Sequence, residues 1–136
     1  MKIGKSIIAT VVITICNVII GAITCGGIFN WVYKLEPVNV WRPIEAPGVT
    51  YYIGVVLFNL LFVLVYAMFH KGIPGKNKLA KGLIFGLCVW AAGVLPGMFA
   101  TYIFMTVAPT VILYWAIMGL VQEPLKGAIT AAIYGE

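Results

Sequence analysis

The longest uncharged stretch of the sequence extends from Gly82 to Gln122 and contains no Asp, Glu, Lys, Arg or His. A helix needs about 20 apolar residues to cross the hydrocarbon core of a bilayer, so this stretch is long enough to cross twice. A soluble domain of this size does not bury such a run. The pattern therefore predicts an integral membrane protein.

Four segments are long and apolar enough to form spans. They cover approximately residues 6–29, 51–69, 82–102 and 109–133 and make the chain a single membrane domain. We place the turn between the last two spans at residues 105–109, because Pro109 suits the first turn of a helix, where a missing N–H costs nothing. The predicted fold is an all-α, four-helix transmembrane bundle.

Composition supports this prediction. Hydrophobic residues make up 62% of the 136 residues, charged residues make up 10%, and the mean hydropathy is +1.06. The net charge of +5 does not indicate a nucleic-acid partner, because the basic residues lie beside apolar segments, where cations face anionic lipid headgroups. The partner that composition predicts is the lipid bilayer.

The lysines are unevenly distributed between the predicted loops. Those at the chain ends and in the second loop are Lys2, Lys5, Lys71, Lys76, Lys78, Lys81 and Lys126. The first loop carries only Lys34 and Arg42, beside Glu36 and Glu45. Because basic residues concentrate on the cytoplasmic side, both termini and the loop of residues 70–81 are predicted to be cytoplasmic. Basic residues before an apolar stretch are also typical of a signal peptide, but this stretch is long for one, so we expect a retained span.

The first loop, residues 30–50, is rich in aromatic residues and proline. Its aromatic side chains, with those that follow it, are Trp31, Tyr33, Trp41, Tyr51 and Tyr52. Aromatic rings with a polar edge favour the headgroup level, so we interpret them as an interfacial belt, with a ligand lid as the alternative. Pro37, Pro43 and Pro47 argue against a regular helix through this loop.

Small and polar residues recur at helical spacing in each predicted span. The candidate packing glycines are Gly21, Gly82, Gly86, Gly93, Gly97 and Gly119. Helices in membranes associate through close packing of small residues and through interhelical hydrogen bonds, and two G-x-x-x-G pairs lie in the third span. Each helix is therefore expected to present one face for contact and the rest to lipid.

Two amides are predicted near the bilayer midplane. Asn17 and Asn59 lie close to the middle of consecutive antiparallel spans, and Tyr66 follows Asn59 at a seven-residue interval. An unpaired amide at this depth costs several kcal/mol, so each needs a partner. Either they bond each other or neighbouring hydroxyls, or they line a polar path for a solute or ion.

Glu123 and Lys126 are the charges inside a predicted span, with Pro124 between them. Their three-residue spacing allows an ion pair. A pair at the cytoplasmic headgroups is an anchor, whereas a buried one suggests cation or proton binding. Pro124 should kink or loosen the helix, with helix on both sides. We expect His70, at the end of the second span, to be solvated.

No catalytic or cofactor motif is present in the sequence. The single histidine cannot supply both axial ligands of a membrane b-type haem, and the chain has no C-x-x-C, H-E-x-x-H or G-x-x-x-x-G-K sequence. Cys16, Cys25 and Cys88 have no metal-ligand spacing and are interpreted as small buried hydrophobes. We therefore expect neither enzyme activity nor a cofactor.

Several features resemble a group of small uncharacterised prokaryotic four-span membrane proteins. The residues that carry the resemblance are Gly21, Trp31, Tyr33, Lys81, Gly82 and Gly86. It implies a four-span fold in the prokaryotic cytoplasmic membrane and no particular activity. The proline-rich first loop departs from the pattern.

Two classes of function remain open. The first is a non-enzymatic membrane subunit, structural or accessory, that forms a homo-oligomer or joins a larger membrane complex through its small-residue faces. The alternative is a homo-oligomeric channel or carrier for a small solute or ion, with Asn17, Asn59, Tyr66 and Glu123 along a polar route. Pro96 and Pro124 would then supply hinges.

Overall fold

The computed structural model describes residues 2–42 and 47–135, and every regular element in these ranges is a helix. Four long helical rods follow one another along the chain. They are α1 (Ile3–Ile23) with η1 (Thr24–Ile28), α2 (Val49–Phe69), α3 (Lys78–Val89) continued by η4 (Trp90–Val94) and α4 (Leu95–Phe104), and α5 (Pro109–Tyr134). The short helices η2 (Asn30–Lys34) and η3 (Val38–Val40) lie between the first two rods. The all-helical, four-helix prediction is therefore confirmed.

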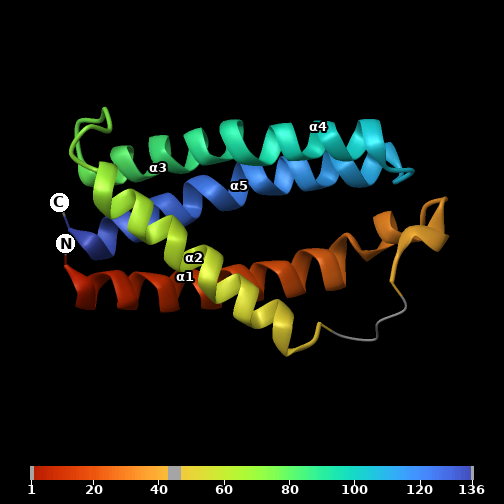
Figure 1. Cartoon of the computed structure of the whole chain (residues 1–136), viewed down its shortest axis with the longest axis horizontal. Helices are drawn as coiled ribbons and strands as arrows, with labels where there is room; N and C mark the ends of the chain where they lie inside the picture. The colour runs from red at the N-terminus through yellow and green to blue at the C-terminus, as the bar shows by residue number, and fades with distance from the viewer. Residues whose placement is uncertain (1, 43–46, 136) are drawn as a thin grey trace.

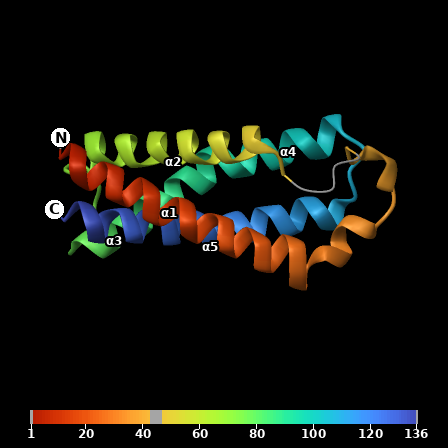
Figure 2. The same cartoon turned by 90° about the horizontal axis from the view of Figure 1, so that it is seen from below.

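The rods alternate in direction, so the two chain termini lie at the same end as the loop between α2 and α3 (Figures 1 and 2). The helix α5 is central, because it contacts α1, α2, α3 and α4. Its most extensive contact is with α3, and in Figure 1 it lies along the α3–α4 rod. The helix α2 is splayed away from α5 toward the opposite end of the molecule (Figure 1).

Three of the rods are long and apolar enough to cross a membrane: Ile3–Ile28, Val49–Phe69 and Lys78–Phe104. The fourth predicted span corresponds to α5, which has sufficient length at 26 residues but is less apolar. Gln122, Glu123 and Lys126 lower its hydropathy. A helix that packs against several others need not be apolar on every face, and charged residues in membrane spans usually lie on a face turned toward the protein interior.

The rod ends follow from local sequence. Pro109 is the first residue of α5, and residues 105–108 form the connection, as predicted. Asn77 caps α3 because its Oδ1 accepts the backbone N–H of Ala80 at 2.9 Å. The helix continues through Pro124, so the expectation of helix on both sides of this proline is confirmed.

Two widened π-type turns interrupt the rods, and the sequence reading did not anticipate either. In η4 the Leu95 N–H bonds to the carbonyl of Trp90, five residues earlier. Pro96 explains this turn, because proline has no N–H and its ring clashes with the carbonyl four residues before it. In η1 the Phe29 N–H bonds to the Thr24 carbonyl at 2.8 Å, around the flexible pair Gly26 and Gly27.

The first loop folds back over the beginning of α5. Trp115 Nε1 donates a hydrogen bond to Tyr33 Oη at 2.8 Å, and the Trp41 ring packs edge-on against both rings. Trp31 is 53% exposed, as a belt residue would be. No regular α-helix runs through the described part of the loop, as its prolines predicted, whereas Pro43 and Glu45 lie outside the described residues. We name Tyr33, Trp41, Tyr114 and Trp115 the aromatic cap.

His70 is buried, so the expectation that it is solvated is wrong. The residue is 6% exposed, and its ring packs against Tyr66 and Tyr134 and places Nδ1 2.9 Å from the carbonyl oxygen of Ala67. The Lys81 ammonium group donates to the His70 carbonyl, and that of Lys5 donates to the Tyr134 carbonyl. These lysines satisfy free carbonyls at the C-terminal ends of α2 and α5.

Candidate functional site

The two midplane amides have different surroundings. Asn59 on α2 is 3% exposed, and its Nδ2 donates a hydrogen bond to Thr14 Oγ1 on α1 at 3.1 Å. Asn17 is half-buried and makes no hydrogen bond through its side chain with the described residues. The two amides therefore do not bond each other, and Asn59 takes the threonine partner that the packing interpretation allowed.

Tyr66 lies in an aromatic cluster rather than along an open path. Its side chain is fully buried, with rings of Phe85, His70 and Tyr134 around it at centroid distances of 5.4, 5.9 and 6.1 Å. Its hydroxyl is buried and has no hydrogen-bond partner among the described residues. The same is true of the Thr130 hydroxyl on α5.

Glu123 and Lys126 form an ion pair near the midpoint of α5. Lys126 Nζ lies 2.7 Å from Glu123 Oε1, and each side chain is only 14% exposed. The ammonium group also lies 4.9 Å from the centre of the Phe62 ring, within cation–π range. Oε2 of Glu123 is buried and has no partner among the described residues. This mid-helix position favours the buried alternative over a headgroup anchor.

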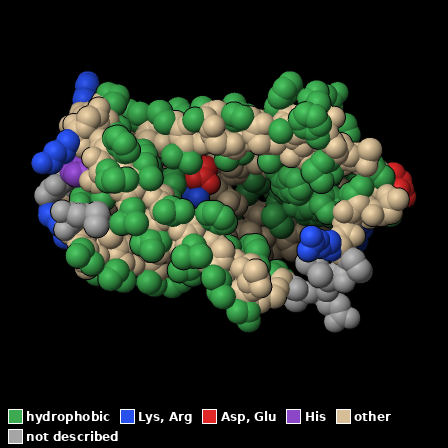
Figure 3. All heavy atoms as spheres, in the orientation of Figure 1, with side chains coloured by type: hydrophobic (Ala, Val, Ile, Leu, Met, Phe, Trp, Pro, Cys, Tyr) green, Lys and Arg blue, Asp and Glu red, His purple; other side chains and the backbone are tan. Residues whose placement is uncertain are grey.

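The ion pair lines a cavity of about 310 Å³ between α2, α3 and α5. Its other lining residues are all apolar: Phe58, Leu61, Phe62, Val65, Phe85 and Val89. Figure 3 shows one acidic and one basic side chain together near the middle of a mostly hydrophobic face, whereas the other charges in this view lie toward the two ends. We name this space the ion-pair cavity.

Some of the predicted packing glycines form contacts within the chain. An added Cβ at Gly82 or Gly86 would overlap the backbone of α5, at Gly127 and at Glu123 respectively. Gly119 makes room for the indole of Trp90, whose Nε1 donates to the Ala116 carbonyl at 2.8 Å. Close packing of α3–η4 against α5 therefore depends on these glycines.

The remaining predicted packing glycines have no neighbour at the corresponding position. A Cβ on Gly21, Gly93 or Gly97 would meet nothing within 4 Å, and Gly93 and Gly97 are exposed. The third rod thus carries two G-x-x-x-G pairs with different surroundings. Gly82 and Gly86 pack against α5, whereas Gly93 and Gly97 have no neighbour and are named the open glycine pair.

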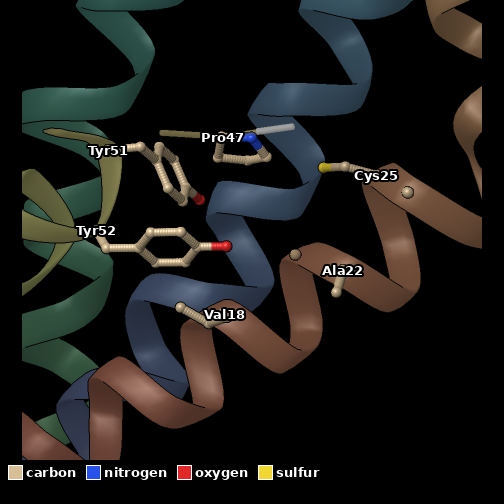
Figure 4. A pocket seen from close by; sticks show the side chains of 8 residues that line it. Val18, Ala22, Cys25, Pro47, Tyr51 and Tyr52 are labelled. Atoms are coloured by element: carbon tan, nitrogen blue, oxygen red, sulfur yellow. The ribbon is translucent and has the colours of Figure 1, made fainter. Parts of the chain in front are cut away.

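A second cavity, of about 350 Å³, lies between the C-terminal half of α1 and the start of α2. Tyr51 and Tyr52 point from α2 toward α1, and the Cys25 thiol faces them from the other side (Figure 4). Cys25 Sγ also lies 3.3 Å from Tyr114 Oη, which links η1 to α5. This sulfur contact therefore gives Cys25 a packing role.

Sequence reasoning missed Trp90, Tyr114 and Trp115. Trp90 and Tyr114 make contacts between rods, and Trp115 bonds Tyr33 of the first loop. Their positions in the sequence alone did not distinguish them from aromatic residues at the outer surface of a bundle. Within the described ranges, no group of three or more His, Cys, Asp or Glu side chains comes together to hold a metal ion.

Comparison with known proteins gives no relative from which a function could be transferred. No protein family, curated protein or solved structure matches the chain. The resemblance to small four-span prokaryotic membrane proteins therefore stays an expectation.

Proposed function

We propose that this chain is a non-enzymatic, multi-pass membrane subunit, structural or accessory, with four spans and both termini in the cytoplasm. Three rods are apolar enough to cross a bilayer, and α5 lies among them. An even number of crossings agrees with termini that share one end of the bundle (Figure 1). The basic residues at that end, including Lys71 and Lys76, support a cytoplasmic location, and we propose the prokaryotic cytoplasmic membrane.

The observation that carries the subunit role is the contrast between the two glycine pairs of the third rod. Gly82 and Gly86 bring α3 into backbone contact with α5, whereas Gly93 and Gly97 face open space. In a bilayer, small residues are used where helices approach closely, because lipid itself gives no hydrophobic force between helices. The open pair therefore fits a helix from another chain, either a second copy or a different membrane protein.

The polar side chains support a channel or carrier less well. Asn59 bonds Thr14 on the α1 side of α2, whereas Glu123 pairs with Lys126 in the ion-pair cavity. The hydrogen bonds of the described residues do not link Asn17, Asn59, Tyr66 and Glu123 into one route. A homo-oligomeric channel or carrier remains the alternative, with its route between chains.

The test is the native mass of the protein in lipid nanodiscs, together with whatever copurifies. We expect a defined multiple of the 14.8 kDa chain, or a stoichiometric complex with another membrane protein. The double variant Gly93→Leu and Gly97→Leu should lose that assembly without unfolding, because leucine fits in open space and is a better helix former than glycine.

The matched control is Gly4→Leu on α1, which is also exposed with nothing within 4 Å of its Cβ and should keep the wild-type mass. A wild-type protein that is monomeric and alone, or a double variant that assembles normally, would overturn the proposal. Ion flux through a homo-oligomer that Glu123→Gln abolishes while assembly is retained would favour the channel or carrier.

A further inference from the structure

The ion pair in the middle of α5 leaves one hydrogen-bonding atom without a partner. Lys126 is engaged on two sides, by Glu123 Oε1 at 2.7 Å and by the Phe62 ring at 4.9 Å. The carboxylate has a second oxygen, Oε2, which is buried and accepts no hydrogen bond from the described residues. The pair has no net charge, so what Oε2 lacks is a hydrogen-bond donor and not a second positive charge.

The space beside this carboxylate suits an apolar molecule. The ion-pair cavity has a volume of about 310 Å³, at the small end of the range for ligand pockets. Three of its six apolar walls are phenylalanines, Phe58, Phe62 and Phe85. Phe58 is 72% exposed and Leu61 is 54% exposed, so this side of the cavity faces the lipid of the proposed bilayer. An acyl chain alone would fill the apolar space and leave Oε2 without a donor.

We propose that the ion-pair cavity binds a small amphiphile that enters from the bilayer and donates one hydrogen bond to Glu123. An alcohol is the simplest such group, because it donates a proton and brings no net charge to a neutral ion pair in a medium of low dielectric constant. The outer torsion of glutamate is broad, so a small rotation of the carboxylate can turn Oε2 toward the donor. The aromatic walls hold the apolar body of the ligand.

The test compares two probes of nearly equal shape on the protein in phosphatidylcholine nanodiscs. One is 4-phenylbutanol, which donates a hydrogen bond, and the other is its methyl ether, which only accepts one. Binding is measured by saturation-transfer NMR with titration. We expect saturable binding of the alcohol and at least tenfold weaker binding of the ether. Equal binding of the two probes, or binding of neither, would overturn the proposal.

Two variants link the binding to this cavity. Leu61→Trp fills the space from its lipid-facing wall and leaves both residues of the ion pair in the sequence, and it should weaken alcohol binding at least tenfold. Leu57→Trp is the matched control, because Leu57 is on the same helix, is 53% exposed and does not line the cavity. Unchanged binding to Leu61→Trp, or equal losses in both variants, would show that the probe is bound elsewhere or dissolved in lipid.

A third variant replaces the hydrogen-bond acceptor at position 123 by a donor. Glu123→Gln keeps a carbonyl for Lys126 and replaces the unpartnered acceptor by an amide N–H donor. We expect the preference for the alcohol over the ether to fall to less than about threefold, because the ether oxygen can now accept from the amide. A tenfold preference that persists in Glu123→Gln would exclude the carboxylate as the acceptor.

Discussion

Gly82 on α3 and Gly127 on α5 lie with their backbones in direct contact, and each leaves no room for a side chain at the other. A Cβ at Gly82 would also meet the Ala131 side chain at 2.7 Å. This contact belongs to the most extensive helix pair of the molecule. The contact between Gly82 and Gly127 stabilises the packing of α5 on α3, because a close approach of two backbones increases dispersion contacts along both helices.

The first prediction concerns this contact. Gly82→Ala should lower the free energy of unfolding by about 3 kcal/mol, because the two backbones must move apart to admit a methyl group. Denaturant unfolding in detergent micelles measures the effect. Gly97→Ala is the control and should not destabilise the protein, since its Cβ would meet nothing within 4 Å. Similar stabilities for the two variants would contradict the close contact.

The second prediction concerns the hydrogen bond between Asn59 and Thr14. A double-mutant cycle of Asn59→Leu and Thr14→Val should give a coupling energy of about 0.6 to 2 kcal/mol, the range for hydrogen bonds between membrane helices. Thr10→Val replaces Thr14→Val in the control cycle, because the Thr10 hydroxyl bonds its own helix at the Ser6 carbonyl. Equal coupling in both cycles would show that Asn59 has a different partner.

The third prediction is a pH dependence of the aromatic cap. Burial raises the pKa of Tyr33 above its ordinary value of 10, and this effect exceeds the opposing one of the Trp115 hydrogen bond. The neutral phenol is therefore favoured in the folded cap. The stability that this neutral phenol gives the folded protein is fully present below pH 10. It is lost as the pH rises above 10, because the phenol ionises at a lower pH in the unfolded chain than in the folded one.

Tryptophan fluorescence between pH 8 and 12 measures this loss, since Trp41 and Trp115 both pack on Tyr33. Tyr33→Phe should reduce the change in fluorescence at alkaline pH, because phenylalanine has no hydroxyl to ionise. The exposed Tyr51 provides the control, and Tyr51→Phe should leave the transition unchanged. An identical transition in wild type and Tyr33→Phe would refute the assignment.

The fourth prediction concerns orientation in the membrane. In a background without the three native cysteines, Asn39→Cys should react with a membrane-impermeant maleimide on intact cells. Lys71→Cys should react only after the cells are permeabilised, because the lysine-rich loop is proposed to be cytoplasmic. The opposite pattern of labelling would invert the topology.

The rods could be predicted from sequence because their limits depend on local chemistry. Uncharged stretches defined the rods, and Pro109 marked the start of α5. The two π-type turns were missed because their cause is the fit of Pro96, or of Gly26 and Gly27, into an otherwise continuous helix. Hydropathy is insensitive to such a change in hydrogen bonding.

The site residues were harder to interpret because the same motif occurs in two environments. The pairs Gly82–Gly86 and Gly93–Gly97 have identical spacing, but only the first meets α5. The position of Glu123 likewise depended on how far α5 continues beyond it, which sequence alone left open. The partners of Trp90 and Trp115 lie 26 and 82 residues away, so no local pattern identifies them.

The most direct test of the subunit role is cross-linking at the open glycine pair in native membranes. In the same cysteine-free background, Gly97→Cys labelled with a short maleimide–diazirine reagent should, on irradiation, form a covalent adduct with a second copy or with one other membrane protein. The control is Ile19→Cys on α1, because Ile19 is also exposed, at 52%, and this variant should remain uncross-linked. Equal cross-linking at both positions, or none at position 97, would contradict assembly through this face.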